Sequence, residues 1–207
     1  MSYKNFIIIP VGDLEVNCVI FICPETGSAA VFDPGDEADK IISEIERNNA
    51  VPEMIINTHC HYDHIGAVDM IRKEYKIPFC VHEQEEEYAS DPGKNYSMIS
   101  GRAISLKPDI LFKDGQKIMI GNTELTVIHT PGHTLGSCCF MIGGCLLSGD
   151  TLFAGSVGRA DLYGGDENTL INSIKNKILI LDEDTPVIPG HGRTTNLKEE
   201  KRFNPFF

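Results

Sequence analysis

The sequence has few positively charged side chains for its number of carboxylates. Its 18 lysines and arginines face 30 aspartates and glutamates, which gives a formal net charge of -12. No basic cluster interrupts this excess of negative charge. Such a surface repels phosphate groups, so we expect a small-molecule substrate and neither a nucleic acid nor an anionic membrane as partner.

Long hydrophobic segments are missing as well. No apolar run approaches the roughly 18 residues that a membrane-spanning helix needs. The apolar run near the N-terminus is too short for the core of a signal peptide. These two absences predict a cytoplasmic protein.

The sequence also lacks the CxxC motif that is typical of metal-binding and redox-active cysteines. The seven cysteines contain no CxxC pair, and they stand at positions 18, 23, 60, 80, 138, 139 and 145. A chain of 207 residues can bury a hydrophobic core without disulfides. We therefore expect reduced and mostly buried thiols.

The order of apolar segments predicts an α/β fold in a single domain that spans residues 1–207. Apolar stretches that alternate with turns predict three antiparallel strands in the first 33 residues, and helical spacing follows from Ala38 to Ile45. Strands and helices alternate in both halves of the chain, and we find no linker. The expected architecture has four layers in the order αββα, with two mixed sheets and helices on their outer faces.

The remaining elements are expected from the same patterns. Strands are predicted at 54–56, 79–81, 116–120, 123–129, 137–142, 145–148 and 187–188, and helices at 66–76, 82–89 and 168–178. Residues 90–109 show no period. A loop of this length is more often functional or mobile than structural, so this segment is our candidate lid.

The most informative segment is a dense group of metal-ligand side chains directly after the apolar run Met54 to Ile56. It reads His59-Cys60-His61-Tyr62-Asp63-His64. Residues two positions apart diverge on a helix, so the segment is expected to be a loop. Imidazoles with a carboxylate suit zinc, iron or manganese in a catalytic site, whereas a structural zinc site favours thiolates. The alternatives are a histidine-rich polar loop or a structural zinc site.

Three further candidates lie after later apolar runs, each beside a glycine: His133, Asp150 and His191. Glycine removes side-chain bulk and lets a ligand approach. His82 and His129 lie outside this pattern, and we expect them to pack or to support the ligands. Packing is also the expected role of Cys60, with oxidation as the alternative.

These positions resemble the fingerprint of the metallo-β-lactamase superfamily, HxHxDH followed by a distant His, Asp and His, over residues 58–192. The resemblance implies two divalent metal ions, with zinc first and iron or manganese as alternatives. It implies that the first metal is held by His59, His61 and His133, the second by Asp63, His64 and His191, and that Asp150 bridges them. A metal-bridging hydroxide would attack the substrate carbonyl, and Asp63 would act catalytically by moving its proton.

The segment from Ser148 to Leu162 resembles the GDTLF…GxxGRxD segment of the glyoxalase II (hydroxyacylglutathione hydrolase) group. The tail from Pro189 is similar to that of the short bacterial members. This resemblance implies hydrolysis of a small thioester, S-lactoylglutathione or a related acyl thiol. Full-length members contact glutathione through a helical C-terminal domain, whereas 16 residues follow His191 here.

Without that domain, other side chains have to contact the substrate. The candidates are Arg159, Tyr96 and Arg102, with Lys94 as a further cation. A structural role for Arg159 is equally compatible with the sequence, because arginine often pairs with a carboxylate such as Asp161 or Asp166.

Other functions of the same superfamily stay open. The persulfide dioxygenase group shares a GRxD-like segment but uses one iron and oxygen, which would make the protein an oxidoreductase. A phosphodiesterase or other ester hydrolase is less favoured because the surface is acidic. A β-lactamase is less favoured because such enzymes are usually exported, and a non-enzymatic partner domain would need a fused flavin domain. The sequence gives no oligomeric state.

Overall fold

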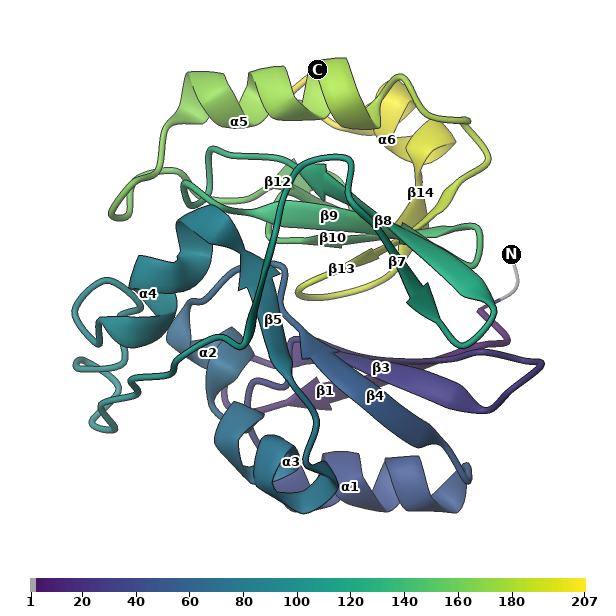
Figure 1. Cartoon of the computed structure of the whole chain (residues 1–207). Coiled ribbons are helices and arrows are strands. Elements are labelled where there is room, and N and C mark those ends of the chain that lie inside the picture. Colours follow the sequence, from purple (N-terminus) through teal and green to yellow (C-terminus); the bar gives the residue numbers. More distant parts are fainter. Residues whose placement is uncertain (1–2) are drawn as a thin grey trace.

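Two six-stranded sheets pack face to face, and helices cover both outer faces (Figure 1). This computed structural model describes residues 3–207. The two layers of strands between two layers of helices confirm the predicted αββα architecture.

The first sheet has its strands in sequence order. These are β1 (Phe6–Val11), β2 (Val16–Ile22), β3 (Ser28–Phe32), β4 (Val51–Ile56), β5 (Phe79–His82) and β6 (Ile110–Phe112). The first three pair antiparallel, as predicted, and β3 to β6 pair parallel, so the sheet is mixed. β6 was not predicted, because three residues, two of them exposed, give no periodic signal.

The second sheet has the order β14-β13-β10-β9-β8-β7. Its strands are β7 (Lys117–Ile120), β8 (Thr123–His129), β9 (Cys138–Ile142), β10 (Cys145–Gly149), β13 (Pro186–Pro189) and β14 (Thr195–Asn196). Only β10 and β13 pair parallel. A separate ribbon of β11 (Leu152–Phe153) and β12 (Ser156–Val157) follows β10.

Amphipathic helices cover each sheet. On the first sheet α1 (Ala38–Arg47) and α3 (Val68–Tyr75) bury their apolar side chains against the strands. On the second, α5 (Glu167–Ser173), the π-helical turn Ile174–Ile178 and α6 (Leu197–Phe203) do the same. The other helical segments are α2 (Tyr62–Ile65), the 3-10 turn Glu83–Glu85 and α4 (Glu86–Ser90). The short α6 was not predicted.

A shared core holds the two sheets together. Phe32 of the first sheet packs on Phe140 of the second, with ring centroids 5.7 Å apart, and apolar side chains of both sheets surround them. Aromatic pairs at this separation stabilise the fold by more than the burial of their apolar surface alone. The core therefore fixes the strand ends of both sheets relative to each other.

The predicted state of the thiols is confirmed, since all seven cysteines are free and buried. Within residues 3–207, no helix is long and apolar enough to cross a membrane.

The candidate lid has no regular secondary structure from residue 91 to residue 109. Its base is fixed, because the buried Asn95 donates to the carbonyl oxygens of Tyr88 and Ile104 at 3.0 and 2.9 Å. Its tip, with Met98 and Ile99, is exposed. Opening of this segment stays a prediction.

Candidate metal centre

All seven predicted ligands follow the ends of four strands that meet at one edge of the sandwich. β4 leads to the histidine-rich segment, β8 to His133, β10 to Asp150 and β13 to His191. The two sheets are tied together here, because Cys138 N donates to Thr58 O at 2.9 Å. Loops at strand ends are held by the rigid sheets beneath them, which suits a functional site.

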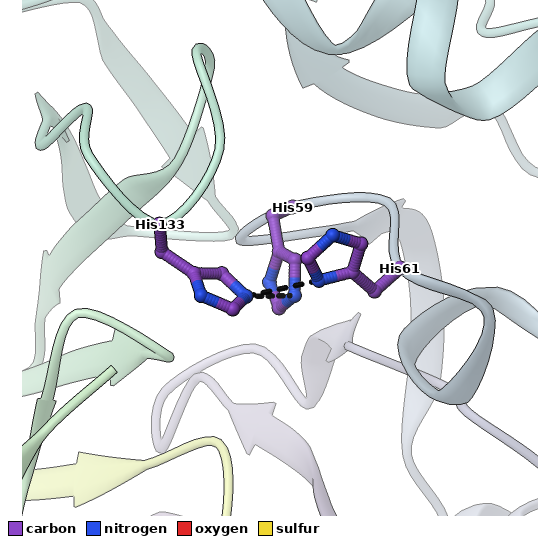
Figure 2. A group of neighbouring side chains, drawn as sticks. All are labelled: His59, His61 and His133. Carbon is purple, nitrogen blue, oxygen red and sulfur yellow. Dashed lines mark hydrogen bonds between the residues drawn. The ribbon is translucent and has the colours of Figure 1, made fainter. Parts of the chain in front are cut away.

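The first group consists of three buried imidazoles, His59, His61 and His133 (Figure 2). His133 Nε2 lies 3.2 Å from His59 Nε2 and 2.9 Å from His61 Nδ1. Two nitrogens bound to one zinc ion in a tetrahedron lie about 3.3 Å apart. The three nitrogens are therefore spaced as ligands of a single ion.

The second group consists of Asp63, His64 and His191. His191 Nε2 lies 3.2 Å from Asp63 Oδ2, and His64 Nε2 lies 3.6 Å from the same oxygen. The expectation that the whole histidine-rich segment is a loop was wrong for its second half. Asp63 and His64 lie in the short helix α2, which turns both side chains towards His191 while His59 and His61 remain in the loop.

Asp150 lies between the two groups. Its Oδ2 is 3.6 Å from His133 Nε2 and 3.7 Å from His191 Nε2, and its Oδ1 is 3.5 Å from His64 Nε2. A Cβ on Gly190 would collide with Asp150 Oδ1, so a side chain at this position would displace the carboxylate from between the two groups. The predicted division into two ligand sets and one bridging carboxylate fits this geometry.

The residues also fit two metal ions by their chemistry. His64 Nε2 and Asp150 Oδ1 are buried and have no hydrogen-bond partner among the described residues. Each such atom destabilises the fold by about 1–3 kcal/mol unless something binds it. Divalent cations would supply that partner, and neutral imidazoles with carboxylates form the donor set that zinc or iron accepts. Binding itself stays a prediction.

Electrostatics differ between the two groups. Burial, together with the neighbouring histidines, holds the pKa of His59 and of His61 well below its usual value. Burial also opposes charge on His64, but the carboxylates of Asp63, Asp150 and Asp33 outweigh it and raise the pKa to about 10. His59 and His61 are therefore neutral at pH 7, whereas His64 in the second group is a protonated imidazole in metal-free protein.

The outer nitrogens of two predicted ligand histidines donate to backbone carbonyls. His133 Nδ1 lies 2.7 Å from Arg159 O, and His191 Nδ1 lies 2.9 Å from Leu14 O. A carbonyl oxygen only accepts, so in the neutral imidazole the hydrogen is on Nδ1 and the lone pair is on Nε2. Both rings thus direct a lone pair towards the centre.

Asp33 and Glu85 are buried carboxylates that the sequence analysis missed. Asp33 accepts from the backbone and the hydroxyl of Thr58, both at 2.7 Å, and lies 3.2 Å from His64 Nδ1. Glu85 accepts from Cys60 N at 2.7 Å and from Gly136 N at 3.0 Å. Asp33 therefore orients His64, and Glu85 joins the loop of His59 and His61 to the loop of His133.

A cavity of about 310 Å³ opens over the two groups of predicted metal ligands, which we call the metal groups. We call it the metal pocket. Asp63, Asp150 and the histidines 61, 133 and 191 line its polar side, and Leu14, Ile99 and Leu162 line its apolar side. This combination accommodates a small molecule with a polar reacting centre.

The three candidate substrate residues have different surroundings. Tyr96 lines the metal pocket with a backbone φ of 63°, and its hydroxyl accepts from Tyr163 N at 2.7 Å. Arg159 also lines it but is paired with Asp161 through two hydrogen bonds of 2.7 and 2.8 Å. Arg102 lines a neighbouring cavity instead.

The other residues singled out in the sequence contact neighbouring side chains and take no part in the metal groups. Lys94 pairs with Glu87 and lies over the ring of Tyr163. His82 stacks on His129 with ring centroids 4.0 Å apart, and neither belongs to a group that could hold a metal within residues 3–207. The thiol of Cys60 is buried, and burial raises its pKa well above the usual value, so the side chain packs.

Comparison with known proteins identifies the family. The model of the metallo-beta-lactamase superfamily matches residues 11–191, and the chain belongs to that superfamily. It is 38% identical over 201 residues to the probable metallo-hydrolase YqgX of Bacillus subtilis, covering 95% of this chain and 94% of the relative. It is 32% identical over 207 residues to hydroxyacylglutathione hydrolase GloC of Haemophilus influenzae, covering 98% and 97%.

Solved structures are similar along almost the whole chain. The B3 metallo-beta-lactamase BLEG-1 superposes with a TM-score of 0.93 at 40% identity, covering 97% of this chain and 98% of that one. TTHA1623, solved in a di-iron-bound form, superposes with a TM-score of 0.86 at 33% identity, covering 97% and 100%. The protein is thus a metallo-hydrolase-type member of the superfamily with a site suited to two metal ions.

Proposed function

We propose that this protein hydrolyses a small thioester, S-lactoylglutathione or a related acyl thiol. The observation that carries the proposal is the similarity to the Haemophilus hydroxyacylglutathione hydrolase, which extends over 98% of this chain. The segment from Gly149 to Asp161, with Gly-Asp-Thr-Leu-Phe at its start and Gly-Arg-Ala-Asp at its end, supports it. The metal pocket is of a size for a small substrate, and the acidic surface disfavours nucleic acid.

The metal ligands would be His59, His61 and His133 for one ion and Asp63, His64 and His191 for the other, with Asp150 between them. When bound, two divalent ions supply Lewis acidity, which lowers the pKa of water and stabilises negative charge on a substrate oxygen. Zinc or iron fits these ligands, and we propose zinc.

Asp63 is the candidate proton acceptor. Burial alone would raise its pKa, but His64 and His191 outweigh burial and hold the pKa of this carboxyl well below its usual range. The carboxylate is therefore anionic at neutral pH and faces the metal pocket. It accepts a proton from the water that adds to the thioester carbonyl.

Tyr96 is a candidate for orienting the substrate. Its hydroxyl oxygen accepts from Tyr163 N, so its own hydrogen is free to be donated to a substrate oxygen. When the carbon–sulfur bond breaks, the sulfur leaves as a thiolate. Since a thiol has a pKa of about 8.5, the leaving group needs no strong acid to protonate it.

The test is an assay of purified protein, with its metal content quantified, against S-lactoylglutathione. We expect thioester hydrolysis that is lost in Asp63→Ala and His133→Ala. Asp184→Ala is the matched carboxylate control, because the Asp184 side chain is 83% exposed. Two bound metals without thioester turnover would contradict the proposal. One bound iron with oxygen uptake on glutathione persulfide would establish the dioxygenase alternative instead.

The similarity to BLEG-1 favours a second candidate, hydrolysis of a β-lactam amide. Both reactions begin with water adding to a carbonyl, and they differ in the leaving group, a thiolate or an amine. A thiolate leaves without a proton, whereas an amine nitrogen needs one. Parallel assays with a β-lactam and a thioester on one preparation separate the candidates by their kcat/KM ratio.

We place the activity in a reducing compartment such as the cytoplasm. The support is the set of seven free and buried thiols, since secreted proteins commonly pair their cysteines. Subcellular fractionation of the source cells, with immunodetection of the protein in each fraction, tests this placement. Recovery of the protein from an oxidising compartment would contradict it.

A further inference from the structure

A second cavity adjoins the metal pocket. Its volume is about 300 Å³, and it shares Leu14, Tyr62 and Asp63 with the metal pocket. We call it the side pocket. Gly35 and Gly66 line it, and a Cβ on either residue would collide with backbone, on Gly35 with Asp63 O and on Gly66 with Gly35 O. Glycine at both positions allows the backbone at Gly35 to pack directly on the backbone at Asp63 and Gly66. This part of the lining therefore carries no side chain.

One wall of the side pocket carries a positive charge. Arg102 lines it, and one of its terminal nitrogens donates to Gly66 O at 3.0 Å. Among the described residues, no carboxylate forms an ion pair with Arg102, whereas Arg159 is engaged on two nitrogens by Asp161. A guanidinium has five N–H donors, so Arg102 is positioned by Gly66 and retains donors for a carboxylate.

Negative charges also line the side pocket. Asp13 lies in the turn between β1 and β2, and Asp36 lies just before α1. Asp36 accepts from Glu37 N at 2.7 Å, and neither carboxylate forms an ion pair within residues 3–207. The side pocket thus offers partners for an anion and for a cation, which complements a zwitterion.

We propose that the side pocket binds an amino-acid group of the substrate's thiol moiety, with the carboxylate at Arg102 and the ammonium at Asp13 and Asp36. The proposal rests on thioester hydrolysis in the metal pocket. Leu14, Tyr62 and Asp63 line both cavities, so the two cavities adjoin at these residues. In the proposed pose the thioester carbonyl lies in the metal pocket and the thiol moiety lies in the side pocket. Arg102, rather than the paired Arg159, then determines specificity for charged thiols.

Two thioesters that share the lactoyl group test this assignment. S-lactoylglutathione carries the amino-acid group, and S-lactoyl-N-acetylcysteamine has no charge. In Arg102→Gln we expect a roughly tenfold rise in KM for the first, unchanged kcat, and no change for the second, because charge-assisted hydrogen bonds are lost only with the charged thiol. The double variant Asp13→Asn/Asp36→Asn should show the same selectivity. Arg202→Gln, on α6 and outside both pockets, is the matched control.

Binding of S-methylglutathione, a thioether that cannot be hydrolysed, gives a readout without turnover. Calorimetry on metal-loaded protein should show roughly tenfold weaker binding in Arg102→Gln. Equal losses for both thioesters, or unchanged S-methylglutathione binding, would overturn the proposal and leave Arg102 as a structural contact to Gly66. If the wild type hydrolyses neither thioester, the proposed function fails, and the binding measurement alone decides the side pocket.

Discussion

The two halves of the candidate metal centre differ in residue types, charge and exposure. His59, His61 and His133 are almost completely buried, and burial keeps the imidazoles of His59 and His61 neutral. The second half combines the carboxylate of Asp63 with His191, whose side chain is 26% exposed. The first half resembles a preorganised ligand set, whereas the second must exchange the proton of His64 for its metal. The two halves should therefore respond differently to substitution and to pH.

The largest expected effect comes from removing one ligand of either half. His133→Ala and His191→Ala should each lower kcat/KM by on the order of 10³-fold, since metal-assisted stabilisation is worth several kcal/mol. Elemental analysis should separate them. His133→Ala should lose the metal of the first half, and His191→Ala should retain it. Equal loss of both metals from both variants would show that the halves are not independent.

The next effect is the pH dependence of metal binding. In metal-free protein the raised pKa of His64, about 10, keeps this imidazole protonated between pH 6 and pH 8, so binding in the second half must displace a proton. Affinity there should rise by about tenfold per pH unit. The lowered pKa values of His59 and His61 predict little pH dependence in the first half. Calorimetry in buffers of different ionisation enthalpy measures the protons released.

A smaller effect is expected from the two buried carboxylates behind the ligands. Asp33→Asn should weaken binding in the second half roughly 10- to 100-fold, because Asp33 orients His64. Glu85→Gln should weaken binding in the first half by a similar factor, because the amide nitrogen cannot accept the hydrogen bonds that Glu85 receives. Competition with a chromophoric chelator measures both affinities. Weakening confined to the opposite half in either variant would contradict the assignment.

The smallest effect is expected at Arg159. Its pair with Asp161 is exposed, with side chains 61% and 68% accessible, and exposed pairs contribute only about 0.2–1 kcal/mol. Arg159→Gln should therefore change the free energy of unfolding by less than about 1 kcal/mol in urea titrations. KM for S-lactoylglutathione should change less than in Arg102→Gln. A larger effect at Arg159 would identify it as the substrate contact.

Local patterns predicted much of the fold. α1 and α3 have apolar side chains at helical spacing, and β8 and β9 are long enough to show as apolar runs. β6, β11, β12 and β14 have two or three residues each, which is too few for any period to appear. These short strands form because their backbones pair with a neighbouring strand. The pairing depends on where that neighbour lies in the fold.

The candidate ligands were also accessible from local sequence. They lie directly after apolar strands, and four of them fall within six residues, so their residue types and spacing were informative by themselves. The helix α2 was not predicted, because the side chains of this segment converge with one another only in a loop. In the fold, Asp63 and His64 converge with His191, which is 127 residues further along than His64.

What the sequence determined by itself is therefore the identity of the histidines and aspartates, their strand-end positions and the αββα layering, since each follows from short-range spacing and hydrophobic periodicity. Only the tertiary structure decided which groups are neutral or charged, that Asp33 and Glu85 support the ligands, and that Arg102 faces a different pocket from Arg159. The burial of a side chain, the distances between side chains and the pairing of charges depend on contacts between residues far apart in the chain. Local sequence patterns do not predict such contacts.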